Sequence, residues 1–320
     1  MQKIFIKKLI SNDKFNYNDI LQSILKKETE EKKRVKVSEE FKLLKNKTGY
    51  DYLKFMCKHV KNKTTCRTET TNQLLDERTV FIIEQLNEMG VNYKVVPFTF
   101  NNYMFAGYGG PKLANVEAFI PATEKTKSTI IFTAHHDIVN TESENCQDNT
   151  ASVCNLLDLC SQISRMKKRE KNIYIVFTDG EEFGGCGASR LCDGIRKGKY
   201  GKVEGIIDLE VTACGSKVWV EKRVKDDSHI ANKLAGFKHY NINYFFTPYN
   251  QAMTMRTFGI DAVCIGILPK EEAEGMNNSN AYQRSSCWSL CHSILDTFER
   301  SANKEDMSRL VKLLKRFINE

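Results

Sequence analysis

Apolar residues along the chain predict helices and strands in alternation. A stripe at helical spacing runs through residues 74–89 and ends at Gly90, a residue type that commonly follows the last turn of a helix. Further helices are predicted at Asn149–Lys167 and over residues 307–317, where apolar positions again share one face. Short apolar runs between the helices predict strands at Val91–Phe100, Thr129–Thr133, Asn172–Thr178, Glu204–Val211 and Ala262–Leu268.

This alternation is typical of an α/β domain with three layers, α/β/α, around a central mixed, mostly parallel sheet. Ala262–Leu268 is apolar throughout, as expected for a strand that is buried on both faces. The length of 320 residues allows one large domain with a substantial core. Because Lys and Glu dominate the start of the chain, we expect residues 1–64 to form a partly helical extension and residues 65–320 to form the main domain.

The charge of the chain excludes some classes of partner. The net charge of +8 comes from 48 Lys and Arg against 40 Asp and Glu, and the basic residues are spread along the sequence. A nucleic-acid reader more often gathers its basic residues into a patch or motif, so we expect no nucleic-acid partner. No apolar run approaches the roughly 18 residues of a membrane-spanning helix, so we expect no membrane partner.

The cysteines and the N-terminus predict a cytoplasmic protein. Several of the 11 cysteines, such as Cys154, Cys160 and Cys264, fall inside predicted helices or strands. Reduced, buried thiols fit such positions better than a disulfide framework does. The apolar stretch at the start of the chain is short and interrupted by lysines, which does not fit a secretory signal.

Histidines and acids follow the predicted strands. His135, Glu181 and Glu182 come directly after strand ends, where ligands gather in open α/β sheets. Adjacent acids such as Glu181 and Glu182 repel each other unless a cation lies near, and a metal would supply that cation. One glutamate would then be a ligand and the other a free general base.

Other residues extend this candidate metal site. Asp137 is close enough to His135 to accept its second ring N–H, and a downstream nitrogen ligand is available in His292. Asp148 opens a predicted helix, so it is either an N-cap or a carboxylate that bridges two metals. Asp208 and Glu210 are two apart on a predicted strand, so either acid could face the site.

Together these segments resemble the M28 family of zinc aminopeptidases, which are co-catalytic two-zinc enzymes. The similarity covers about residues 65–318. It rests on His-x-Asp after a strand, an Asp-Asn pair opening a helix, Gly-Glu-Glu before glycine-rich sequence, and a final histidine motif. These are His135-His136-Asp137, Asp148-Asn149, Gly180-Glu181-Glu182 and His292-Ser-Ile-Leu-Asp296-Thr297.

The resemblance implies a zinc-exopeptidase fold, two zinc ions and a peptide substrate that loses its N-terminal residue. One zinc would be held by His135, Asp148 and Glu210, and the other by Asp148, Glu182 and His292. Glu181 would be the general base for a water that bridges the metals. Asp137 would orient His135, and Tyr249 would stabilise the tetrahedral intermediate, as a tyrosine does in some members.

The chain also departs from the family pattern. Glu210 stands where the family usually has Asp, Asn250-Gln251 replaces part of a Ser-Asp-His segment, and Ile294 replaces a proline. Two alternatives therefore stay open: a single-zinc acyltransferase of the glutaminyl-cyclase type, and a non-catalytic peptide-binding member of the same fold. Candidate residues of the substrate pocket, for which core packing is the competing interpretation, are Phe183, Tyr282 and Trp288.

Overall fold

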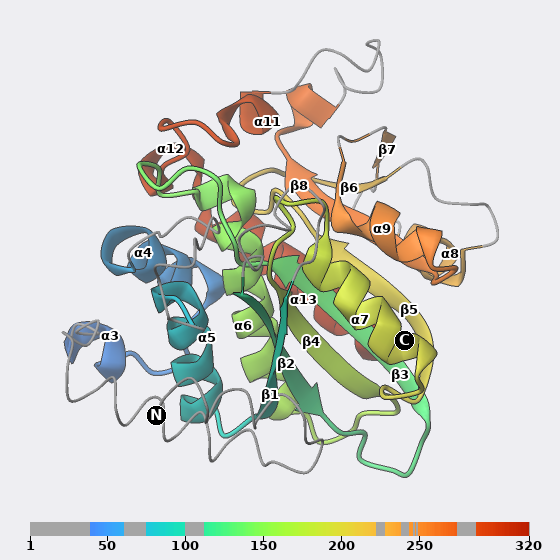
Figure 1. The fold of residues 1–320 in the computed structure, drawn as a ribbon. Coiled ribbons are helices and arrows are strands. Elements are labelled where there is room, and N and C mark those ends of the chain that lie inside the picture. Colours follow the sequence, from blue (N-terminus) through green and yellow to red (C-terminus); the bar gives the residue numbers. More distant parts are fainter. Residues whose placement is uncertain are drawn as a thin grey trace. The chain divides into compact units, whose positions relative to one another are not determined.

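The computed structural model describes residues 39–60, 75–99, 112–221, 228–237, 243–245, 247, 249–273 and 286–319. All of them belong to one compact unit, Glu39–Glu320. Its centre is an eight-stranded sheet in the order β1-β2-β4-β3-β5-β8-β6-β7 (Figure 1). The strands are β1 (Asn92–Thr99), β2 (Lys112–Ile120), β3 (Ser128–His135), β4 (Asn172–Thr178), β5 (Lys202–Leu209), β6 (Lys217–Glu221), β7 (Asn243–Phe245) and β8 (Ala262–Leu268).

The four central strands β4, β3, β5 and β8 run parallel to one another. The antiparallel pairs lie on either side of them: β1 with β2, β2 with β4, and β6 with β8. The predicted mixed sheet with a parallel centre is therefore confirmed. Because parallel strands end at the same edge of a sheet, β3, β4 and β5 bring their carboxyl ends together.

Helices cover both faces of the sheet, which makes the predicted three layers (Figure 1). On one face, α6 (Ala151–Ser164) contacts β3 and β4 and packs against α4 (Gly49–His59), α5 (Glu77–Glu88) and α13 (Lys304–Asn319). On the other face, α7 (Cys186–Arg196) contacts β2, and α9 (Gln251–Thr257) contacts β5 and β8. Helix α8 (His229–Ala235) contacts β5 and β8 on the face of α13, where Lys233 lies over the Phe317 ring. The remaining short helices are α3 (Glu39–Leu43), the π-helical turn η2 (Cys146–Thr150), α11 (Ser286–Leu290) and α12 (Phe298–Ser301).

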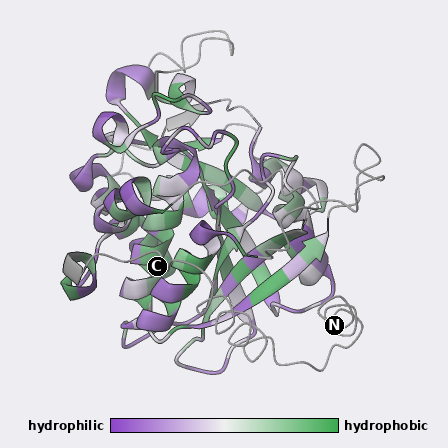
Figure 2. Ribbon diagram, turned by 60° about the vertical axis from the view of Figure 1, so that its left-hand side comes forward, coloured by the Kyte–Doolittle hydropathy of each residue, from purple (hydrophilic) through white to green (hydrophobic). Residues whose placement is uncertain are grey.

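The apolar pattern of the sequence explains this layering. All seven residues of β8 are buried, and the apolar stripe of α13 buries Leu310, Leu314 and Phe317. Figure 2 shows hydrophobic segments gathered in the middle of the unit and hydrophilic segments toward its outside. None of the described helices has the length and apolar character needed to cross a membrane.

The compact unit begins before the expected boundary at residue 65. Helix α4 starts with a capping box in which Thr48 and Asp51 bond each other's backbone N–H. It buries Tyr52, Leu53 and Met56 against the unit, and the Gly49 N–H donates to Asp158 of α6 at 2.9 Å. The described end of the lysine- and glutamate-rich region is thus part of the same core as the sheet.

Candidate metal centre

The candidate ligands meet at the carboxyl edge of the parallel strands. His135 is the last residue of β3 and pairs in register with Thr178, the last residue of β4. Glu181 and Glu182 follow β4 by three and four residues, and Glu210 comes directly after β5. The sheet thereby brings together side chains that are separated by about 75 residues in sequence.

The first group of ligand atoms consists of His135, Asp148 and Glu210. The His135 Nε2 atom lies 3.1 Å from Asp148 Oδ1 and 3.4 Å from Glu210 Oε1. All three residues are buried, and their ligand atoms lie within 4.8 Å of one another. This is the set that the resemblance assigned to one zinc.

The second group consists of Asp148, Glu182 and His292. The His292 Nε2 atom lies 3.0 Å from Asp148 Oδ2 and 3.1 Å from Glu182 Oε2. Asp148 therefore directs one carboxylate oxygen toward His135 and the other toward His292. Its side chain makes no cap on α6, whose N-cap residue is Thr150.

Glu181 lies beside these two groups. With His135 and Glu182 it forms a third set of possible ligand atoms, all within 4.8 Å of one another. In the described part of the chain its carboxylate accepts no hydrogen bond, and the residue is 9% exposed. Such a carboxylate can take up a proton, as a general base requires.

Asp137 fixes this corner of the site. Its two oxygens accept the backbone N–H groups of Glu181 and Glu182, each at 3.1 Å. Its Oδ1 atom also lies 3.4 Å from His135 Nδ1, the ring nitrogen that faces away from Asp148. One buried carboxylate therefore orients both the imidazole and the turn that carries the two glutamates.

The structure adds two positioning residues that sequence reasoning missed. The Asn149 amide donates to Leu209 O at 2.9 Å and to Glu210 Oε2 at 3.0 Å, which aims Glu210 at the site. The Asp296 carboxylate accepts the backbone N–H groups of Gln147 and Asp148. Both residues stood inside the recognised motifs, Asn149 beside Asp148 and Asp296 after His292, but the motifs alone did not show these contacts.

Protonation in the site follows from burial and crowding. Burial raises the pKa of Glu210 to about 7 and raises that of Glu181 well above its ordinary value, with neighbouring carboxylates adding to the effect. Burial alone would also raise the pKa of Asp148, but hydrogen bonds with His135 and His292 outweigh it and hold that pKa low. Hydrogen bonds to Asp148 and Glu182 raise the pKa of His292 to about 10.

The donor set fits zinc. Four carboxylates and two imidazoles converge here, and His135, Asp148 and Glu210 are buried. The Glu182 Oε1 atom is buried without a hydrogen-bond partner among the described residues. Buried like charges are costly unless a cation neutralises them, and nitrogen with carboxylate oxygen is a donor combination that binds zinc.

The remaining candidates lie as follows. Asp208, the alternative to Glu210, accepts hydrogen bonds from Thr133 and Gln251 at 2.7 and 2.9 Å and stands outside the ligand groups. Tyr249 is half exposed, its hydroxyl contacts Thr254 at 2.5 Å, and it is near enough to Glu181 for that charge to raise the pKa of the phenol further, burial being the main cause.

The three residues suggested for the substrate pocket lie in different places. Trp288 is buried, with its ring centroid 5.8 Å from that of Trp219, so it packs in the core. Phe183 is partly exposed in the turn after Glu182. Tyr282 lies outside the described residues. Phe183 directly follows the ligand candidate Glu182.

The family model of peptidase family M28 matches residues 115–306, which include every ligand candidate. The chain belongs to peptidase family M28. A search of curated proteins gives no match to this M28 chain.

Solved structures resemble the M28 chain in fold at low sequence identity. An aminopeptidase from Aneurinibacillus sp. strain AM-1 has a TM-score of 0.65 at 12% identity, covering 87% of this chain and 94% of the other. A glutaminyl cyclase from Fimbriiglobus ruber has a TM-score of 0.66 at 14% identity, covering 86% and 95%. The zinc aminopeptidase BSAP from Bacillus subtilis has a TM-score of 0.54 at 15% identity, covering 66% and 50%. The fold is thus shared by two kinds of enzyme.

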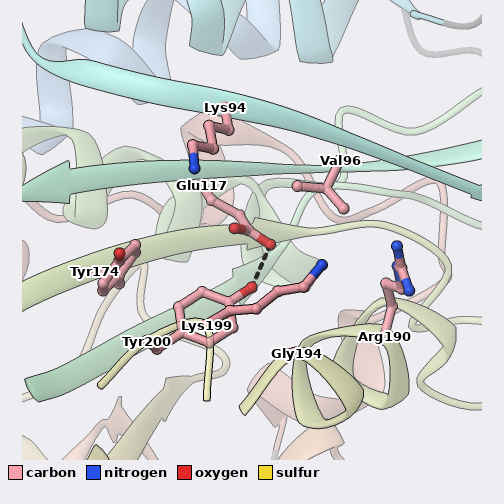
Figure 3. A pocket seen from close by; sticks show the side chains of 8 residues that line it. All are labelled: Lys94, Val96, Glu117, Tyr174, Arg190, Gly194, Lys199 and Tyr200. Atoms are coloured by element: carbon pink, nitrogen blue, oxygen red, sulfur yellow. Dashed lines mark hydrogen bonds between the residues drawn. The ribbon is translucent and has the colours of Figure 1, made fainter. Parts of the chain in front are cut away.

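A cavity of about 110 Å³ lies between the sheet and the C-terminal end of α7, away from the ligand groups (Figure 3). Its walls include Tyr174, near the start of β4, and Tyr200, which precedes β5. Glu117 of β2 points into it and accepts a hydrogen bond from the Tyr200 hydroxyl at 2.6 Å. The M28 chain therefore has a second buried carboxylate site, on the α7 face of the sheet, where Glu117 pairs in register with Val176 of β4.

Proposed function

We propose that this M28 chain is a two-zinc exopeptidase that removes N-terminal residues from peptides. The observation that carries the proposal is the position of Asp148, whose two oxygens face different imidazoles at 3.1 and 3.0 Å. A carboxylate shared in this way suits a pair of metal ions. His135 and Glu210 would complete one coordination sphere, and Glu182 and His292 the other.

Zinc ions bound here would supply Lewis acids that polarise the scissile carbonyl and make water more acidic. The protein supplies the proton transfers. Glu181 takes a proton from the attacking water on its free carboxylate and delivers it to the nitrogen of the departing amine. Burial raises the pKa of Glu181, so its carboxylate binds a proton more readily than that of an exposed glutamate.

Two further residues hold the reacting groups in place. Asp137 fixes the backbone of Glu181 through its hydrogen bond to the amide, so the base keeps one position relative to His135. Tyr249 stands at the rim near Glu181, where its hydroxyl would donate to the oxyanion of the tetrahedral intermediate. Both roles are part of the proposal.

The test is a paired measurement of zinc and turnover. We expect the purified full-length chain to bind two zinc ions and to cleave an aminoacyl arylamide within a panel of N-terminal residues, with loss of cleavage after chelation. Glu181→Gln should lower kcat by about 10²–10⁴-fold while both zinc ions are retained. Glu117→Gln is the matched control, because it removes a buried glutamate outside the centre.

Two results would contradict the proposal. A chain that binds zinc but cleaves no member of the panel is not an aminopeptidase. A Glu181→Gln variant that loses zinc would show that Glu181 is a ligand, which would reverse the roles of the two glutamates.

The second candidate is a single-zinc acyltransferase of the glutaminyl-cyclase type. Its support is that glutaminyl cyclases match the fold as well as aminopeptidases do, with TM-scores of 0.66 and 0.65. Cyclisation of a peptide with N-terminal glutamine, together with one bound zinc, would favour this candidate. Two bound zinc ions and arylamide cleavage would exclude it.

A further inference from the structure

Two cysteines from separate ligand-bearing segments lie close together beside the metal centre. The Cys214 and Cys287 sulfurs are 3.9 Å apart. Cys214 lies four residues after Glu210, and Cys287 lies in α11, five residues before His292. The pair therefore brings the loop after Glu210 into contact with the segment that precedes His292.

The third ligand segment also contacts this pair. The Gln147 side chain donates to Cys214 Sγ at 3.4 Å and accepts the Ala213 N–H at 3.2 Å. Gln147 directly precedes Asp148, the residue between the two ligand groups. Movement of Cys214 would thus be transmitted to the segment of Asp148 as well as to that of Glu210.

The two thiols differ in reactivity. Cys214 is partly exposed and Cys287 is buried. A hydrogen bond from the Cys287 thiol lowers the pKa of Cys214, and the same bond raises the pKa of Cys287. Cys214 is thereby the more readily ionised and the more accessible of the two, as the attacking thiol of a redox pair should be.

We propose that Cys214 and Cys287 are a reversible redox pair, which closes to a disulfide with a peroxide and so weakens zinc binding at the adjacent centre. The Cys214 thiolate attacks one peroxide oxygen, and the O–O bond breaks to give a sulfenic acid and hydroxide, which leaves as water. The Cys287 sulfur then attacks the sulfenic sulfur, and its hydroxyl leaves as a second water with the Cys287 proton. Two thiols lose two electrons and two protons, and the peroxide is reduced.

The geometry predicts the effect on the centre. A disulfide requires a sulfur separation of about 2.05 Å, so the sulfurs must approach each other by roughly 2 Å. His292 is 51% exposed and is the least buried member of the ligand groups, so it is the member most easily drawn away. Zinc held by Asp148, Glu182 and His292 should then bind about ten times more weakly.

The experiment uses the full chain and does not depend on turnover. Reduced protein is treated with equimolar hydrogen peroxide, alkylated, digested without reduction and mapped by mass spectrometry. We expect a peptide in which Cys214 is linked to Cys287 and which disappears after dithiothreitol. Zinc affinity is measured by competition with a chromophoric chelator before and after oxidation.

Two variants make the test specific. Reduced Cys214→Ser should bind zinc with the affinity of reduced wild type. Treatment with peroxide should not change the zinc affinity of this variant. Cys192→Ser is the control, because Cys192 is a free thiol on α7 outside the ligand-bearing segments, and the zinc affinity of this variant should respond to peroxide as that of wild type does. The disulfide is mapped by mass spectrometry in the wild-type protein. That result therefore stands even if Cys214→Ser fails to fold.

Three results overturn the proposal: no cross-link, a cross-link between other cysteines, or equal zinc affinity in the two oxidation states. The effect on zinc rests on the proposed function. Failure of the reduced chain to bind zinc would therefore count against the metal centre, while the map would still decide whether the two cysteines form a pair.

Discussion

The metal centre and the cavity under α7 both bury carboxylates, but they stabilise them in different ways. In the cavity, Glu117 is alone, accepts a hydrogen bond from Tyr200, and has the cations of Lys94, Arg190 and Lys199 around it (Figure 3). In the centre, four carboxylates converge on two imidazoles. In the cavity the cations outnumber the one acid, whereas in the centre the acids outnumber the imidazoles.

The ratio of acids to protein cations indicates which of the two sites requires a metal ion. A single buried acid can have its burial cost reduced by a hydrogen-bond donor and by nearby protein cations. Acids that outnumber their protein cations stay ionised together only if a metal joins them. Burial of a carboxylate by itself therefore does not mark a catalytic site, and the balance of charge around it does.

The largest expected effect comes from Asp148→Asn. An amide has one oxygen and cannot bridge two ions, so we expect zinc content to fall from two ions to one or none and arylamide cleavage to be lost. Metal analysis of the purified variant measures this. Asp208→Asn, which changes an equally buried acid outside the ligand groups, should keep both ions. Full zinc content in Asp148→Asn would mean that Asp148 bridges nothing.

A smaller effect is expected from Asn149→Ala. Without the amide that donates to Glu210 Oε2 at 3.0 Å, the Glu210 carboxylate loses its fixed orientation. Loss of such a supporting contact typically weakens metal binding by about 10–100-fold. A chelator competition assay would test this, with Asn172→Ala as the control because its amide bonds the backbone at the opposite end of β4. Equal affinities in the two variants would exclude a positioning role.

The smallest effect is expected from Glu117→Gln, which should leave zinc binding and turnover unchanged. Burial raises the pKa of Glu117 above its unfolded value, although the Tyr200 hydrogen bond and the nearby cations oppose the shift. The folded state therefore binds the Glu117 proton more tightly than the unfolded state does, and this residue's contribution to stability falls as the pH rises above the unfolded value of about 4.3.

The glutamine variant cannot lose that proton, so it should melt at a slightly higher temperature than wild type at pH 7, by roughly 2 °C. The difference should shrink as the pH falls toward 4. Thermal unfolding between pH 4 and pH 7 gives the melting temperatures of wild type and Glu117→Gln for this comparison. A variant that is less stable than wild type at pH 7 would show that ionised Glu117 is fully stabilised by Lys94, Arg190 and Lys199.

The sequence predicted the strands that carry the ligands, because their apolar runs are continuous. It did not predict β2, whose buried positions include Asn115 and Glu117 and therefore break the apolar pattern. These polar residues are accommodated by partners far along the chain, such as Gly187 O for Asn115 and Tyr200 for Glu117. Periodicity records the residues of one segment and cannot reveal such partners.

The choice between Asp208 and Glu210 shows the same limit. Two residues apart on a strand, they should face one side. The structure distinguishes them by their partners: Asp208 accepts hydrogen bonds from Thr133 and Gln251, whereas the Glu210 carboxylate lies beside His135 and accepts a hydrogen bond from Asn149. Only the family motif indicated Glu210 in advance, because these partners lie far along the chain.

The contact between Asp296 and the Asp148 segment has a consequence for synthesis of the protein. Asp296 binds the backbone N–H groups of Gln147 and Asp148 across almost 150 residues, and His292 lies in the same late segment. A ribosome-bound chain that has made all of β3, β4 and β5 still lacks both residues. The second ligand group, Asp148 with Glu182 and His292, can therefore assemble only after the segment of residues 292–296 has been made and has docked on the Asp148 segment.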